Sequence, residues 1–156
     1  MSVLNVSAQA DRQFIREGNR LYRQQNYVKA ETEYRKALSQ NSRNTQAMYN
    51  LGCALMMQKK DSLGIKWLEH AAQEEKIPLR RAKAFHNMGV ICQGHQLFAE
   101  AIEAYKSSLR LNPTDNETRY NLVLCQRQLK NNPQKSNQNK NQKDKNNQNK
   151  DKRKQQ

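Results

Sequence analysis

The fold is decided by a pattern that is clearest in residues 84–113, AFHNMGVICQGHQLFAEAIEAYKSSLRLNP. Phe85, Met88 and Cys92 recur at spacings of three and four residues, which places their side chains on one face of a helix. Gly89 lies beside this face. A small residue follows twelve positions after the glycine, and an aromatic residue four positions further on. The stretch therefore predicts two helices that pack closely against each other.

The same pattern occurs twice earlier in the chain. Gly18, Gly52 and Gly89 are separated by 34 and 37 residues. The residues that should face them from each second helix are Ala30, Tyr34 and Ala37, then Gly64, Leu68 and Ala71, then Ala101, Tyr105 and Ser108. A period of this length indicates a repeat architecture, in which no hairpin buries its apolar face alone and neighbouring hairpins must stack. The glycine leaves room where the second helix crosses the first.

The helix ends agree with this period. Asn41-Ser42, the Pro78 region and Asn112-Pro113 should end the second helices. Asp61-Ser62 and Thr114-Asp115 are predicted N-caps. The three additional residues before the third unit lie near 77–81, where they lengthen the connection or the following helix.

A final helix is expected at residues 116–130. It begins like the first helix of a repeat, but Val123 replaces the glycine and no second helix follows. Arg119 and Gln126 stand where the repeats carry core residues, as suits a terminal helix with a polar outer face. We predict a leader at residues 1–10, a repeat domain at 11–130 (repeats at about 11–44, 45–81 and 82–115, then the capping helix) and a tail at 131–156.

Composition distinguishes the C-terminal tail from the rest of the chain. The chain of 156 residues carries a net charge of +14. Residues 131–156 are almost entirely Asn, Gln, Lys and Asp, so we expect them to be disordered. The tail is consistent with three roles. It can be a solvated spacer, a segment attracted to anionic lipid or an acidic protein, or a contact with nucleic acid. Without interleaved aromatic residues, nucleic-acid binding is not expected.

The leader allows two interpretations. Residues 1–10 are mildly apolar and end in a small-x-small pattern, as in the last part of an export signal, but they have neither a basic start nor a full apolar stretch. A frayed polar leader explains them equally well. Cys53, Cys92 and Cys125 are scattered among apolar neighbours, so we expect free thiols in helix packing.

These features resemble the tetratricopeptide-repeat (TPR) family over about residues 11–130. The resemblance implies an all-α fold: a right-handed αα-superhelix of three TPR hairpins plus a C-terminal solvating helix. Departures are mild, with Glu17 where Leu is usual, Gly64 in place of Ala, and Ser108 in the third unit. Such domains bind other proteins, so the resemblance implies a non-catalytic scaffold without a cofactor.

At a closer level the chain is similar to the small TPR proteins of Bacteroides aerotolerance (Bat) operons. The likeness lies in the leader before Asp11-Arg12, in residues 101–106 (AIEAYK) and 117–122 (ETRYNL), and in the tail. It implies a periplasmic or envelope-associated scaffold that works with von Willebrand A-domain membrane proteins and a MoxR-type ATPase. The alternative is a cytoplasmic co-chaperone that binds acidic C-terminal peptides.

In a stack of this kind the first helices line a concave face, where a peptide would bind. The residues expected to project there are Arg12, Asn19, Tyr49, Asn50, Lys83, His86, Asn87, Tyr120 and Asn121. An Asn side chain both donates and accepts, so it can hold an extended backbone; equally, these asparagines can join neighbouring helices. Lys83, with Arg12 or Arg16, should attract an acidic group.

The sequence leaves a carboxylate clamp open and disfavours a metal site. Asn19, Asn50 and Lys83 resemble part of the carboxylate clamp of chaperone-binding TPR domains, but Ile15 and Asn87 replace two of its basic residues. Sequence spacing does not favour a metal site at His70, His86 or His95. Trp67 and Met56-Met57 are expected mainly in packing.

Overall fold

The computed structural model describes residues 3–133, with side chains from residue 9 onward, and these residues form seven α-helices and no strand. The helices are α1 (Val3–Arg23), α2 (Tyr27–Gln40), α3 (Thr45–Met57), α4 (Asp61–Glu74), α5 (Pro78–Gly94), α6 (Phe98–Leu111) and α7 (Asn116–Asn131). Most of the predicted tail lies outside the described residues. Residues 3–10 continue α1 into the predicted leader.

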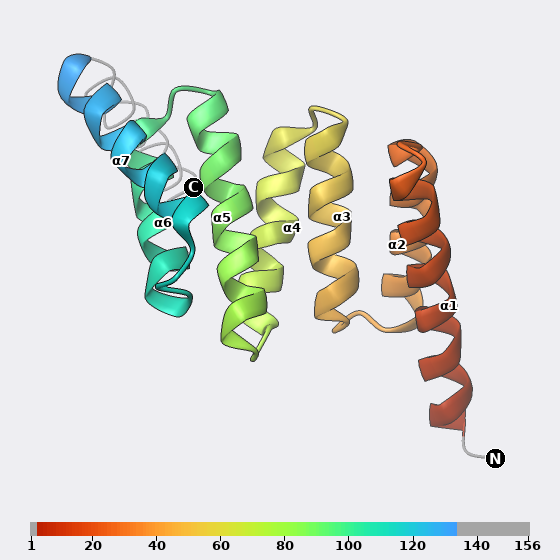
Figure 1. Cartoon of the computed structure of the whole chain (residues 1–156). Helices are drawn as coiled ribbons and strands as arrows, with labels where there is room; N and C mark the ends of the chain where they lie inside the picture. The colour runs from red at the N-terminus through yellow and green to blue at the C-terminus, as the bar shows by residue number, and fades with distance from the viewer. Residues whose placement is uncertain (1–2, 134–156) are drawn as a thin grey trace, which may run out of the picture.

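The helices form three antiparallel hairpins stacked side by side. The extensive contacts are those between α1 and α2, α3 and α4, and α5 and α6, followed by those between consecutive hairpins and between α6 and α7. In Figure 1, α1, α3, α5 and α7 lie towards the viewer and α2, α4 and α6 behind them. The predicted all-α stack of three hairpins with a terminal helix is therefore confirmed.

The glycines lie where the two helices of each hairpin cross. A Cβ atom at Gly18 would lie 2.5 Å from Cε1 of Tyr34, and one at Gly89 would lie 2.5 Å from Cε1 of Tyr105. In the second hairpin, a Cβ at Gly52 would lie 2.8 Å from Cγ of Leu68. These separations are too short for real carbon atoms. The 34-residue pattern therefore marks the sites where a large side chain of the second helix lies over the first.

The core consists of these large side chains and small residues around them. Tyr34 and Tyr105 are fully buried, and burial raises the pKa of both hydroxyls far above their ordinary value of 10. The three cysteines are buried free thiols, as expected. Ile15 is also in the core, where it joins Ala37 and Ala47.

The turns inside the hairpins explain one wrong N-cap. Gln25, Lys59 and Gln96 each have φ near +60°. In each turn the N–H of the following residue donates to the carbonyl of the residue five positions before it. In the second hairpin this turn makes Lys60 the N-cap, without a side-chain hydrogen bond, and α4 begins at Asp61. The prediction of an Asp61-Ser62 cap is therefore wrong. Asp115 is the N-cap of α7, where its side chain accepts from the N–H of Thr118.

The three additional residues of the third unit extend a helix. α3 begins seven residues before Gly52, whereas α5 begins eleven residues before Gly89. α5 therefore has one more turn at its N-terminus, where Pro78 occupies the first position and needs no N–H partner. In Figure 1 this turn forms the lower end of α5. None of the described helices is long and apolar enough to cross a membrane.

Candidate functional site

Two adjoining pockets lie between the first helices of the hairpins. The first, of about 190 Å³, is lined by Thr45, Gln46, Tyr49, Asn50, Ala71, Glu75, Arg80 and Lys83. The second, of about 250 Å³, is lined by Asn19, Tyr22, Arg23, Tyr34, Tyr49, Asn50 and Cys53. Tyr49 and Asn50 belong to both pockets, so the two form one groove that crosses α3 from α5 to α1. We call it the α3 groove.

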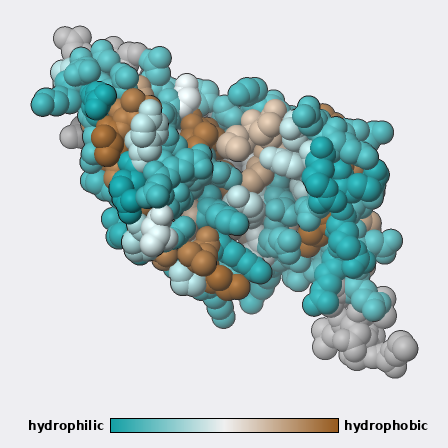
Figure 2. Space-filling view, in the orientation of Figure 1, coloured by the Kyte–Doolittle hydropathy of each residue, from teal (hydrophilic) through white to brown (hydrophobic). Residues whose placement is uncertain are grey.

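The α3 groove contains four of the nine residues predicted from the sequence. Asn19, Tyr49, Asn50 and Lys83 line one or both of its pockets. Figure 2 shows the same face of the molecule, where hydrophilic residues predominate. The groove itself has a mixed lining, in which amide and charged groups alternate with tyrosine rings, Ala71 and Cys53.

The asparagines in and beside the groove form hydrogen bonds between helices and can also contact a ligand. Oδ1 of Asn19 accepts from the Tyr34 hydroxyl at 2.8 Å and from Nδ2 of Asn50 at 2.9 Å. Nδ2 of Asn87 donates to the Tyr49 hydroxyl at 3.1 Å. The bond between Tyr34 and Asn19 lies within the first hairpin, whereas the other two bonds join successive hairpins, and together they fix the side-chain orientations. The two sequence-based interpretations of the asparagines are therefore compatible, because one end of an amide can be bonded while the other faces the groove.

Burial makes the tyrosines of the groove harder to ionise than usual. Burial raises the pKa of Tyr49 far above its ordinary value of 10, and the nearby Cys53 adds to the effect. Burial likewise raises the pKa of Tyr22 to about 12. Both hydroxyls therefore remain protonated at any physiological pH and act only as neutral hydrogen-bonding groups.

One end of the groove is basic. Lys83 is exposed and shares its pocket with Arg80, rather than with the Arg12 or Arg16 expected from the sequence. Glu75 lies in the same pocket, where its carboxylate accepts from Thr45 Oγ1 and from the N–H groups of Lys76 and Ile77. Although burial alone would raise the pKa of Glu75, these hydrogen bonds lower it, so the group stays ionised.

The basic residues of α1 lie elsewhere. Arg12 is exposed on α1. Arg16 lines a separate pocket on α1 and α2 that also contains Phe14, Arg20 and Glu33. Ile15, at a clamp position, is 5% exposed and packs in the core, so it cannot be replaced by a projecting basic residue without disturbing that core. The arrangement differs from a complete carboxylate clamp.

His86 faces α7 and not the α3 groove. Its Nδ1 lies 2.6 Å from Oγ1 of Thr118, and that hydroxyl donates to Oδ2 of Asp115 at 2.7 Å. A hydroxyl has one proton to give, so His86 must be the donor in the first contact and carry its proton on Nδ1. The hydrogen bond from Thr118 is the main cause of the lowered pKa of Asp115. Farther along, Tyr120 is 69% exposed.

Asn121, also on α7, interacts with the hydroxyl of Tyr105. His86 and Asn121 therefore lie at contacts that α7 makes with α5 and α6. Neither these two residues nor Tyr120 lines the pockets of the α3 groove.

Sequence analysis missed a polar contact between neighbouring hairpins whose residues are one repeat period apart. Nε2 of His95 lies 2.7 Å from Oδ2 of Asp61, a residue 34 positions earlier. The repeat period was the available signal, because it brings equivalent ends of neighbouring hairpins together. Within residues 3–133, no three His, Cys, Asp or Glu side chains are placed to hold a metal ion.

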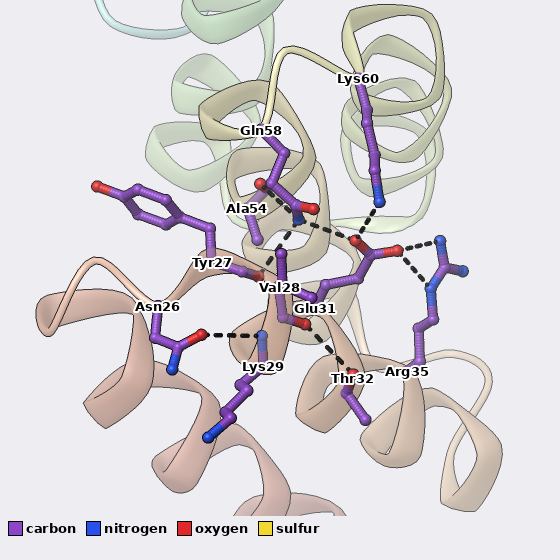
Figure 3. A network of polar contacts seen from close by, with 10 residues as sticks. All are labelled: Asn26, Tyr27, Val28, Lys29, Glu31, Thr32, Arg35, Ala54, Gln58 and Lys60. Atoms are coloured by element: carbon purple, nitrogen blue, oxygen red, sulfur yellow. Dashed lines mark hydrogen bonds and ion pairs between the residues drawn. The ribbon is translucent and has the colours of Figure 1, made fainter.

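A polar network behind the groove joins the first two hairpins. Figure 3 shows Glu31 of α2 between Arg35 of its own helix and two residues of the next hairpin. Oε2 of Glu31 accepts from Nε2 of Gln58 at 2.8 Å and from Nζ of Lys60 at 3.0 Å. Burial opposes the charge, but these donors outweigh it and lower the pKa of Glu31. The network fixes α2 relative to α3, which is the floor of the groove.

Comparison with known proteins identifies the repeat. Models described as "Tetratricopeptide repeat" match residues 15–76 and 82–115, together more than half of the chain. The type IV pilus assembly protein PilF of Pseudomonas aeruginosa is 37% identical over 83 residues, which are 53% of this chain. The chain spans about a third of the length of that relative, since the match covers 32% of it.

Solved structures show the same fold. The first TPR of Spaghetti (RPAP3), bound to the HSP90 peptide SRMEEVD, has a TM-score of 0.72 and 22% identity, with 78% of this chain and 94% of that chain covered. The Sgt2 TPR domain from Aspergillus fumigatus has a TM-score of 0.71 and 19% identity, with 80% and 82% covered. At these identities the likeness concerns the fold alone.

Proposed function

Because the chain belongs to the tetratricopeptide-repeat family, we propose that it is a non-catalytic scaffold that binds an extended segment of another protein in the α3 groove. The observation that carries this proposal is the continuity of the groove. Tyr49 and Asn50 line both pockets, so a segment lying across α3 would contact residues of all three hairpins. A surface built from three stacked units suits a chain-like ligand better than a small compact one.

The groove can hold a peptide backbone. Nδ2 of Asn50 is directed to Asn19 by its hydrogen bond, so Oδ1 of Asn50 is available to accept from a peptide N–H. Oδ1 of Asn19 is occupied by two donors, so its Nδ2 is available to donate to a peptide carbonyl. Contacts of this kind bind a backbone without selecting its side chains. Selectivity then comes from the pockets, and Lys83 favours an acidic group.

We further propose that the scaffold works in an assembly of the cell envelope. The sequence relative PilF is named as a pilus assembly protein. The resemblance to Bat-operon proteins suggests von Willebrand A-domain membrane proteins and a MoxR-type ATPase as partners, and a periplasmic or envelope-associated location. The leader and the basic tail are consistent with this setting, the tail as a peripheral contact with anionic membrane.

A second candidate is a cytoplasmic co-chaperone that binds acidic peptides. Asn50 lines both pockets of the groove, Asn19 lines the second and Lys83 lines the first, which supports part of the clamp resemblance. However, Ile15 is buried and Asn87 donates to Tyr49, so two clamp positions lack a basic side chain. Fractionating cells that make the chain from its natural gene decides between the candidates: recovery in the envelope favours the scaffold, and recovery in the cytoplasm favours the co-chaperone.

Groove binding is tested with selected peptides. Peptides are selected from a random display library on the intact chain, and their affinities are then measured by fluorescence anisotropy. Asn50→Ala should weaken binding about tenfold, because one backbone hydrogen bond and the orientation of Asn19 are lost together. Lys66→Ala, at an exposed position of α4 away from both pockets, is the control and should bind normally. Equal weakening by both variants, or by neither, would contradict the proposal.

A further inference from the structure

The additional turn of α5 has a surface that the repeat architecture does not require. α3 begins seven residues before its glycine and α7 begins at the equivalent position, so neither has this turn. The turn and the connection before it expose two large apolar side chains, Ile77 (45% exposed) and Leu79 (57% exposed). Figure 2 shows hydrophobic residues at the lower edge of the molecule, over this end of α5. We call these two exposed side chains the apolar patch of α5.

The patch is surrounded by basic groups. Residues 76–83 contain Lys76, Arg80, Arg81 and Lys83 and no acidic residue. Leu79 and Lys83 are four residues apart and Arg80 and Lys83 three apart, so these side chains share one side of the helix. The nearest acid, Glu75, already accepts from Thr45 and from two backbone N–H groups.

Arg80 remains available to a ligand. Its side chain is 62% exposed, and its Nη1 lies 3.9 Å from Oε2 of Glu75, beyond hydrogen-bonding distance. A carboxylate from outside can approach its other donors. Arg81 differs, because its Nε donates to the carbonyl of Ala72 and so ties α5 to α4. Arg80 and Lys83 are therefore the charged groups of the turn that can bind a partner.

We infer that this turn is a docking element for a peptide segment that carries an apolar residue flanked by acidic residues, an inference that rests on the proposed function. The apolar residue packs against Ile77 and Leu79, and the acidic residues pair with Arg80 and Lys83. Charge complementarity selects the partner, since the exposed charges of residues 76–83 are all positive. Because Arg80 and Lys83 also line the first pocket, the segment continues from the turn into the α3 groove.

The turn thus gives the groove a direction. The α5 end has two basic groups, Arg80 and Lys83, and the exposed Ile77 and Leu79 beside them, whereas the far end has one basic group, Arg23, among amide and hydroxyl groups. A bound segment places its acidic and apolar part at α5 and a less restricted stretch across α3.

The test uses the intact chain and three fluorescein-labelled peptides, GDELFEDG, GDESSEDG and GKKLFKKG. The variant Leu79→Ser/Arg80→Gln removes one apolar and one basic group from the turn. Its matched control is Val28→Ser/Lys29→Gln, which likewise replaces one exposed aliphatic and one exposed basic side chain, here on α2. We expect GDELFEDG to bind more tightly than the other two peptides. The turn variant should bind it at least about tenfold more weakly, a change of about 1.4 kcal/mol, and the control variant should bind it normally.

The outcomes separate this inference from the proposed function. If Asn50→Ala weakens GDELFEDG binding and the turn variant does not, the turn is not a docking element although the groove is. If all three peptides bind equally, the turn does not select acidic and apolar side chains and the inference is wrong, whereas groove binding is unaffected. If none of the three binds, the inference is likewise contradicted, and groove binding is decided by the peptides selected from the library. If the turn variant loses binding to phosphatidylglycerol vesicles but not to GDELFEDG, the turn contacts lipid and the inference is wrong. Circular dichroism of both double variants should match that of the natural chain.

Discussion

The contact between Gly89 and Tyr105 can be tested by adding one methyl group. In Gly89→Ala the new Cβ would lie 2.5, 2.6 and 2.9 Å from three ring atoms of Tyr105. The ring is fully buried and its hydroxyl donates to Oε1 of Gln93 at 2.6 Å, so it cannot move away without breaking that bond. We therefore expect a net loss of stability despite the better helix propensity of alanine.

The magnitude follows from two opposing effects. Alanine in place of glycine inside a helix is worth about 1 kcal/mol in favour of folding. Overpacking a core costs about 1–3 kcal/mol and occasionally more, and a contact of 2.5 Å against a fixed ring belongs at the upper end. The free energy of unfolding should fall by about 1–2 kcal/mol. Urea unfolding followed by circular dichroism measures it.

Gly94→Ala is the matched control on the same helix. A Cβ at Gly94 meets nothing within 4 Å, so this variant should be as stable as the natural chain or slightly more stable. In a Tyr105→Leu background, the cost of Gly89→Ala should be smaller, because the ring that the methyl group meets is absent. If Gly89→Ala is as stable as Gly94→Ala, the close helix crossing is not what the repeated glycine provides.

Three further tests concern carboxylates that hold the helices and their ends together. Glu31→Ala should lower the free energy of unfolding by about 1–2 kcal/mol, because it removes the half-buried acceptor of the Gln58 amide as well as exposed ion pairs. Glu103→Ala loses one exposed ion pair only, so an equal or larger effect of that variant would contradict the prediction. Asp11→Ala should cost about 1–2 kcal/mol because Oδ2 accepts from two asparagines of the α2–α3 connection, and unchanged urea unfolding would refute it. The fold lowers the pKa of Glu31, Glu75 and Asp115, so their ionised forms contribute fully to the free energy of unfolding above the ordinary pKa values of 4.5 for Glu and 3.8 for Asp. This contribution is lost as the pH falls from those values through the lowered ones. The melting temperature should therefore decrease below about pH 4.5, and a melting temperature that stays constant down to pH 2 would be the contrary result.

The repeat and its glycines could be predicted because they depend on sequence period. Gly18, Gly52 and Gly89 each lie under the large residue sixteen positions later, and that contact is set by the crossing of two helices of one hairpin. One period thus determines both the hairpins and their packing. The terminal helix was predictable for the same reason, because it begins like a repeat and then departs from it.

Contacts between neighbouring hairpins were less predictable. The bond from Asn50 to Asn19 and the place of Arg80 beside Lys83 depend on how far each side chain reaches across the gap between helices. Composition and period carry no information on that distance. The additional turn of α5 is an example: the three added residues were apparent in the sequence, but either a longer loop or a longer helix would have accommodated them. The N-cap lies at Lys60 because Lys59 adopts the left-handed conformation. Lysine is not among the residue types that favour this conformation, so the sequence did not indicate it.

Partner binding in the α3 groove is tested most directly by site-specific photo-crosslinking in the native cell. A benzophenone amino acid replaces Gln46, which lines the first pocket, or Lys66, which is exposed on α4. We expect the Gln46 position to capture a defined protein partner, Lys83→Ala to reduce this product strongly, and the Lys66 position not to give it. A product that forms equally well from Lys66, or that is indifferent to Lys83→Ala, would show that the partner does not bind in the groove.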